Sequence, residues 1–226
     1  MKNLPKEIED EMKEKANIAI AWPCSTSLVY EDFAASFVLM KKGKYMLFRA
    51  RACHDIGILR NGLVNLALGA EATHLLQTDT DMILHRNALY AMLARDVDIV
   101  GALYYKRYPP FNPCAILDKT NINNGLTVKQ CESGDMIEVD RVATGCMLVK
   151  TDVFRKVKYP WFKTIADKNG TLTMSDDYFF CDKAKKAGYK VYVDTSVPCG
   201  HISNIAINEE LWKMNLGGNE IRANTS

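Results

Sequence analysis

Along the first half of the chain, short apolar runs typical of strands alternate with segments whose apolar residues recur at helical spacing. The strands are expected at 17–22, 44–48, 73–76 and 97–105, and the helices at 31–40, 58–68 and 86–95. Strands separated by helices pack as a mainly parallel sheet with helices on both faces. The sequence therefore predicts an α/β fold, and its 226 residues fit a single domain.

The second half has a less regular pattern. After Tyr105 a Pro-rich stretch reads as irregular, and 121–125 reads as a turn. The remaining expected elements are strands at 136–140 and 146–150 around a Gly-containing turn, a helix from 151 to 157, a helix from 175 or 176 to 186, and a strand at 190–194.

Charge and composition exclude several classes of protein. The chain has 29 basic and 27 acidic residues, too even a balance to indicate nucleic acid as a partner. No apolar run approaches the roughly 20 residues of a membrane span, and the charged N-terminus does not resemble a signal peptide. Seven cysteines at scattered spacing, without a Cys-x-x-Cys pair, favour buried thiols over a zinc site. These features predict a cytoplasmic protein without a transmembrane segment.

An Asp-x-Asp sequence follows the apolar run at 73–76. On a strand, Asp79 and Asp81 would project to the same side because side chains alternate between faces. Two adjacent carboxylates repel each other, so burying both favours a bound divalent cation such as Mg²⁺ or Mn²⁺. The simpler alternative is a solvated turn.

Four other groups of residues are candidates for a site. The Pro23–Thr26 loop could approach a nucleotide or could be only a tight turn. Arg60 could pair with a phosphate, could pair with the Asp-x-Asp carboxylates, or could lie on the surface. Asp176 and Asp177 could cap a helix, or one of them could be a general base. His201 could be a metal ligand or a structural histidine.

The order of these motifs resembles that of the GT-A glycosyltransferases, in particular compact family-2-like enzymes of bacteria, phages and large viruses. The resemblance extends from Asn17 to about Ile202. The segments that carry it are Ala72–Met82, Asp98–Tyr105, Ala143–Val149, Ser175–Cys181, Ala187–Asp194 and Gly200–Ile202. Such a chain would have a Rossmann-like GT-A sheet and would transfer a sugar.

The resemblance implies a role for each candidate. Asp177 would be the catalytic base, paired with Asp176, where the family often has Glu-Asp. Asp81 and His201 would hold Mn²⁺ or Mg²⁺ with help from Asp79, and Gly145 would face the acceptor. The nucleotide would be bound by Pro23, Ser25, Thr26, Arg60, Asp79 and Thr80. Tyr104, Tyr105, Lys106, Arg107, Tyr108, Phe111 and Trp161 would lie on the acceptor side.

The resulting hypothesis is a metal-dependent, inverting glycosyltransferase that uses a nucleotide-diphosphate sugar, with UDP favoured over GDP. Its acceptor would be a glycan, a glycoprotein or another hydroxyl compound. Residues 1–16 would form a charged helix, and 17–203 would form the catalytic domain, with a nucleotide-binding half at 17–105 and an acceptor half at 106–203. Residues 204–226 would form a tail that could close over the donor.

Two alternatives stay open, a sugar-phosphate nucleotidyltransferase and a non-catalytic nucleotide- or glycan-binding module. The location would be the cytoplasm, of a host cell if the chain is encoded by a virus or phage.

Overall fold

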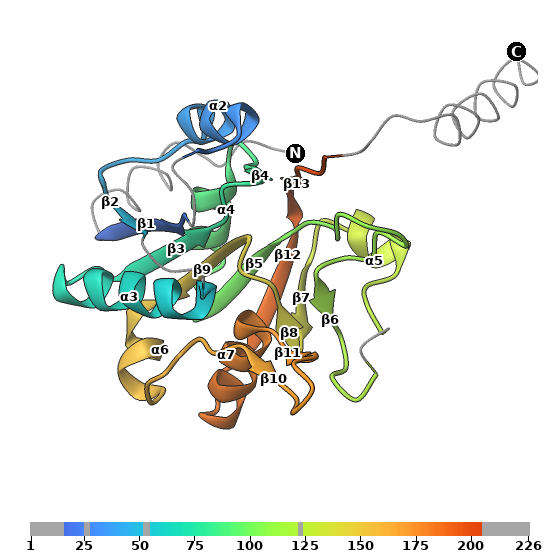
Figure 1. Cartoon of the computed structure of the whole chain (residues 1–226). Helices are drawn as coiled ribbons and strands as arrows, with labels where there is room; N and C mark the ends of the chain where they lie inside the picture. The colour runs from blue at the N-terminus through green and yellow to red at the C-terminus, as the bar shows by residue number, and fades with distance from the viewer. Residues whose placement is uncertain (1–15, 25–27, 52–54, 122–123, 205–226) are drawn as a thin grey trace, which may run out of the picture.

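The computed structural model describes residues 16–24, 28–51, 55–121 and 124–204. Its centre is a seven-stranded sheet (Figure 1). In order across the sheet, the strands are β2 (Tyr45–Ala50), β1 (Ile18–Pro23), β3 (His74–Thr78), β9 (Cys146–Lys150), β5 (Ile99–Leu103), β12 (Val191–Pro198) and β7 (Met136–Val139). The predicted N-terminal helix, apart from residue 16, and the tail beyond Asn204 lie outside the described residues.

The sheet is mostly parallel. Strands β2, β1, β3, β5 and β12 run in one direction, whereas β9 and β7 run in the other. The carboxyl ends of the five parallel strands therefore lie along one edge, where ligands bind in open α/β sheets. This arrangement confirms the predicted α/β fold with a mainly parallel sheet.

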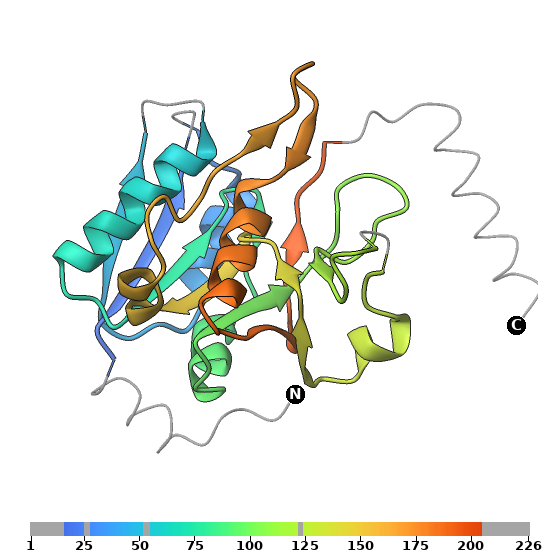
Figure 2. The ribbon, with the colours of Figure 1, turned by 90° about the horizontal axis from the view of Figure 1, so that it is seen from below.

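Two helical layers cover the sheet. Helices α3 (Ile56–Gly69), α6 (Thr151–Lys156) and α7 (Asp176–Lys186) lie on one face, and α2 (Glu31–Leu39) and α4 (Ala88–Ala94) lie on the other (Figures 1 and 2). Because successive side chains alternate between faces, each central strand supplies both cores. On β9, for example, Met147 and Val149 face the first layer, while Cys146 and Leu148 face the second. This double burial explains the continuous apolar runs in the sequence.

Smaller elements surround the sheet. They are β4 (Met82–Ile83) with β13 (Gly200–His201), β6 (Ala115–Ile116) with β8 (Arg141–Val142), the hairpin of β10 (Ile165–Ala166) and β11 (Leu172–Met174), and the short helix α5 (Val128–Glu132). The hairpin projects from the body of the protein beside the start of α7 (Figure 2). No helix in the described ranges is long and apolar enough to cross a bilayer.

The two strands predicted around a Gly-containing turn do not pair with each other. The segments at 136–140 and 146–150 do form strands, but β7 lies at the sheet edge beside β12, whereas β9 lies between β3 and β5. The Gly-containing segment between them therefore crosses the sheet instead of closing a hairpin. Strand β9 gains two strand neighbours and complete burial of Cys146–Val149 at this central position, which favours the longer crossover.

Candidate active site

The Asp79–Asp81 segment follows the end of β3, as the sequence predicts, and it forms a turn before β4. The two carboxylates have different partners. Asp79 Oδ1 accepts a hydrogen bond from Arg60 Nη2 at 2.7 Å, and Asp81 Oδ2 accepts one from Arg107 Nη1 at 2.7 Å. At the end of β3, the Thr78 hydroxyl and the Asp79 amide both donate to the Gly145 carbonyl, at 2.8 and 3.1 Å.

Arg60 connects the turn to the start of α7. It projects from α3 and its guanidinium also donates to Asp176 Oδ2 at 2.6 Å, so one buried cation holds two carboxylates. Burial alone would lower the pKa of Arg60, but Asp79, Asp176 and Asp177 together raise it. Arg60 therefore stays charged and pairs with protein carboxylates, which is one of the roles that the sequence allows it.

Asp176 and Asp177 are neighbours in sequence, but their environments differ. Asp176 is buried and paired with Arg60. Asp177 is half-buried, and its Oδ1 accepts hydrogen bonds from the Ser175 hydroxyl and from the Tyr178 amide. Burial raises the pKa of Asp177, and the charge of Asp176 adds to this increase, although Arg60 opposes it. Of the two acids, Asp177 therefore has the properties of a base.

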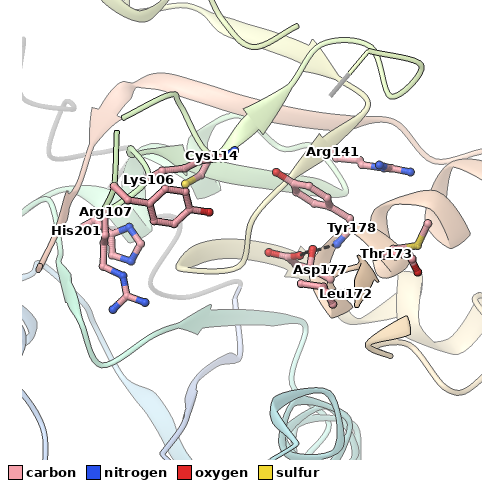
Figure 3. A pocket seen from close by; sticks show the side chains of 12 residues that line it. Lys106, Arg107, Cys114, Arg141, Leu172, Thr173, Asp177, Tyr178 and His201 are labelled. Atoms are coloured by element: carbon pink, nitrogen blue, oxygen red, sulfur yellow. Dashed lines mark hydrogen bonds between the residues drawn. The ribbon is translucent and has the colours of Figure 1, made fainter. Parts of the chain in front are cut away.

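Asp177 lines a pocket of about 510 Å³. Arg107 and His201 lie on one side of this pocket, and Asp177 and Tyr178 lie on the other (Figure 3). The rest of the lining consists of Lys106, Tyr108, Cys114, Arg141, Leu172, Thr173, Met174 and Ser175. Burial raises the pKa of Cys114 to about 12 and also raises that of Tyr178. Asp177 is the acidic side chain among these lining residues, and its raised pKa favours proton acceptance.

His201 lies at the opposite side of the pocket and faces Asp81. Its Nδ1 is 2.8 Å from the Tyr105 carbonyl oxygen, which can only accept, so Nδ1 carries the proton. This leaves Nε2 directed at Asp81 Oδ2, 3.6 Å away. Burial raises the pKa of Asp81, but the neighbouring His201 and Arg107 outweigh this effect and lower it.

The donor atoms around Asp81 fit a divalent cation only in part. Asp81 Oδ1 is buried and has no hydrogen-bond partner within the described residues, which leaves an oxygen ligand available. His201 Nε2 would be the second ligand of such a cation, oriented by the Tyr105 carbonyl as metal-bound histidines commonly are. Within the described parts of the chain, however, no three His, Cys, Asp or Glu side chains form a metal-binding group. A two-ligand site of this kind suits a cation that also binds water and phosphate oxygens.

Other predicted residues have structural positions. A Cβ at Gly145 would lie 2.6 Å from the Tyr104 hydroxyl oxygen, so this residue packs closely against Tyr104. Trp161 is buried and donates through Nε1 to the Phe154 and Val157 carbonyls, both at 2.9 Å, so it is a core residue. Pro23 is the buried last residue of β1, and Thr80 is half-buried in the turn. Ser25 and Thr26 lie outside the described residues.

Three residues make contacts at the site that the sequence analysis did not predict. Arg107 pairs with Asp81, and the Tyr104 ring packs edge-on against His201 with ring centroids 5.3 Å apart. The Tyr104 hydroxyl also accepts a hydrogen bond from the Gly145 amide at 2.8 Å. Arg141 lines the pocket and forms a bidentate pair with Asp182. The signal for Arg107 was its place directly after a central parallel strand, where site residues gather.

Comparisons with known proteins identify the fold. No protein-family model matches the sequence, and no curated protein matches it. Among solved structures, A197 from STIV is 15% identical, with a TM-score of 0.58 over 83% of this chain and 86% of that one. The structure of GalNAc-T7 with UDP, GalNAc and Mn²⁺ is 12% identical, with a TM-score of 0.53 over 91% of this chain. This chain matches 47% of the length of that structure. At these identities the likeness concerns the fold alone, and the chain has a GT-A-like, Rossmann-type fold.

Proposed function

We propose that the protein is a metal-dependent, inverting glycosyltransferase that moves a sugar from a nucleoside diphosphate to an acceptor hydroxyl. One observation carries the proposal. Asp177, a half-buried carboxylate with a raised pKa, lies across a 510 Å³ pocket from Arg107 and His201, both of which contact Asp81. A base and a cationic side that can take a diphosphate therefore share one pocket at the carboxyl edge of the sheet.

The proposed chemistry is a single displacement. Asp177 accepts the proton of the acceptor hydroxyl, whose oxygen bonds to the anomeric carbon as the bond from that carbon to the diphosphate oxygen breaks. The nucleoside diphosphate leaves with the bond's electron pair. One attack from the side opposite the leaving group inverts the configuration. A base positioned in this way contributes roughly 10²–10⁴-fold to the rate.

Asp81 and His201 are the residues that would hold Mn²⁺ or Mg²⁺. When bound, such a cation offsets the negative charge that develops on the leaving diphosphate. Arg107 adds positive charge on the same side of the pocket. Asp79 has a different role in this proposal, because Arg60 draws its carboxylate toward Asp176.

The proposed substrates follow from the fold and from one neighbour. The solved structure of GalNAc-T7 contains UDP, GalNAc and Mn²⁺, which supports a UDP-sugar as the first donor to test. The acceptor would be a glycan, a glycoprotein or another hydroxyl compound. Residues 17–105 would supply most of the donor side, 106–203 most of the acceptor side, and 204–226 a tail that closes over the donor. A family-2-like enzyme acting in the cytoplasm remains our working assignment.

The first test is calorimetric titration of UDP and GDP into the purified protein, with and without Mn²⁺. We expect Mn²⁺-dependent binding of UDP in the wild type and its loss in Asp81→Ala. Asp152→Asn, which removes an exposed carboxylate on α6 far from the pocket, is the matched control and should bind normally. If neither nucleotide binds, the proposed donor site is wrong.

The second test separates catalysis from binding. With a UDP-sugar, the transferase should release UDP, whereas a nucleotidyltransferase would form or consume pyrophosphate. Asp177→Asn should bind UDP with unchanged affinity but lose at least about 100-fold in transfer or donor hydrolysis, because the base is missing. Equal rates in wild type and Asp177→Asn would favour the non-catalytic binding module or a different base.

A further inference from the structure

Arg107 pairs with Asp81, the carboxylate that the proposed cation would need as a ligand. Its Nη1 donates to Asp81 Oδ2 at 2.7 Å, on the oxygen that also faces His201 Nε2. The other oxygen, Asp81 Oδ1, is buried and has no hydrogen-bond partner in the described part of the chain. The guanidinium therefore neutralises Asp81 while leaving one of its oxygens unsatisfied.

A guanidinium and a divalent cation cannot both stay close to Asp81 without repelling each other. Like charges a few ångströms apart repel even near the surface, where the effective dielectric constant is high. The ion pair between Arg107 and Asp81 is also weaker than a buried ion pair, because the Arg107 side chain is 47% exposed and solvent competes for the guanidinium. Binding of a cation at Asp81 should therefore displace Arg107.

The surrounding contacts indicate that Arg107 moves when a cation binds, whereas Asp81 and His201 stay in place. The Asp81 carbonyl accepts a hydrogen bond from the Ile202 amide at 2.7 Å, which ties the turn to the segment that carries His201. The His201 ring is held by the Tyr105 carbonyl and by the Tyr104 ring. Within the described residues, the hydrogen-bond partner of the Arg107 side chain is Asp81, and the side chain projects from an irregular segment into the pocket (Figure 3).

We propose that Arg107 is a positioning residue that holds Asp81 before the cation binds and then moves to the donor diphosphate. This inference rests on the proposed function, because it assigns the diphosphate as the second partner of the guanidinium. The side chain then has two opposite effects. It weakens binding of the cation alone and strengthens binding of the nucleoside diphosphate once the cation is present. A residue with only a structural role would not produce both effects.

The test measures Mn²⁺ binding directly, from the electron paramagnetic resonance signal of free Mn²⁺, in the wild type, Arg107→Gln, Lys106→Gln and Asp81→Asn. Lys106→Gln is the matched control, because it removes the same charge from the same pocket but from a side chain that forms no ion pair in the described structure. We expect Arg107→Gln to bind Mn²⁺ about threefold or more tightly than wild type, the range of an exposed ion pair. Lys106→Gln should stay within about twofold of wild type.

Calorimetry with UDP at saturating Mn²⁺ completes the test. Arg107→Gln should bind UDP about threefold or more weakly than wild type, opposite in sign to its effect on Mn²⁺. The inference is overturned if Arg107→Gln binds Mn²⁺ no more tightly than Lys106→Gln does, or if UDP affinity is unchanged. It is also overturned if no Mn²⁺ binding is lost in Asp81→Asn.

The two proposals fail in distinguishable ways. If UDP binds without any effect of Mn²⁺, the transferase proposal stands in a metal-independent form and the role given to Arg107 is wrong. A different outcome is that Mn²⁺ binds more tightly to Arg107→Gln while no nucleotide binds to any variant. In that case Arg107 does compete with the cation for Asp81, but the proposed donor site and the movement of Arg107 to the diphosphate are wrong.

Discussion

Removing Arg60 should be among the most destabilising substitutions in this protein. The side chain is 4% exposed and forms hydrogen-bonded ion pairs with both Asp79 and Asp176. Arg60→Met keeps much of the apolar volume but leaves two carboxylates without their cation. Asp176 is the more affected of the two, since its side chain is 6% exposed, whereas that of Asp79 is 31% exposed and can be hydrated.

The expected loss follows from this difference in burial. Removing one partner of a buried ion pair typically destabilises a protein by about 3–5 kcal/mol, most of it from the charge left behind. A half-exposed partner contributes about 1 kcal/mol or less. We therefore expect Arg60→Met to lower the free energy of unfolding by about 3–5 kcal/mol. In the double variant Arg60→Met, Asp176→Asn the orphaned charge is gone, so about 1–2 kcal/mol of that loss should be recovered.

Urea unfolding followed by circular dichroism measures these differences in the free energy of unfolding. Arg155→Met is the control, because Arg155 pairs with Asp152 at 2.7 Å on the exposed surface of α6 and should change stability by less than about 1 kcal/mol. The reasoning is refuted if Arg60→Met costs no more than Arg155→Met. It is also refuted if the double variant is no more stable than Arg60→Met, because the loss would then not come from the charge of Asp176.

Two further predictions concern Gly145 and Asp177. Gly145→Ala should destabilise the protein by about 1–3 kcal/mol in thermal or urea unfolding, because the new Cβ would lie 2.6 Å from the buried Tyr104 hydroxyl oxygen. The control is Gly62→Ala in α3, where a Cβ meets nothing within 4 Å, and it should stabilise the protein by about 0.5–1 kcal/mol. Equal effects of the two substitutions would contradict the packing argument. The raised pKa of Asp177 means that the folded protein binds more protons than the unfolded chain between the two pKa values. Stability should therefore fall as pH rises through that window, and Asp177→Asn should show a shallower fall; an unchanged slope would mean that burial does not raise this pKa.

The alternation of strands and helices could be predicted because it is written in local periodicity. Strands β1, β2, β3 and β5 and the helices between them each have their own apolar pattern, so their existence did not depend on distant contacts. The central position of β9 could not be predicted in the same way. A continuous apolar run such as Cys146–Val149 has the same pattern whether its strand runs parallel or antiparallel, and its neighbours are decided by pairing with β3 and β5.

The residues of the candidate site also differ in whether their roles could be predicted from the sequence. Asp177 could be selected because two acids at the start of a helix form a local signal. Its choice over Asp176 came from the family resemblance, because the physical difference between the two acids depends on the pairing of Asp176 with Arg60, 116 residues away in the chain. Arg107 was missed as a partner of Asp81 because nothing in its own surroundings distinguishes it from Lys106. Only the folded arrangement shows which of the two cations reaches the carboxylate.

The Asp-x-Asp turn illustrates why a motif does not fix the roles of its own residues. On a strand, a two-residue spacing would place Asp79 and Asp81 side by side, and a shared cation would be the natural way to offset their repulsion. In the turn, each acid meets its own arginine, so that repulsion is already relieved within the protein. Arg60 is buried and its pairs are structural, whereas Arg107 is exposed and its pair can break. Of the two carboxylates, Asp81 is therefore the one available to a ligand, and Asp79 is the one that holds the turn against the start of α7.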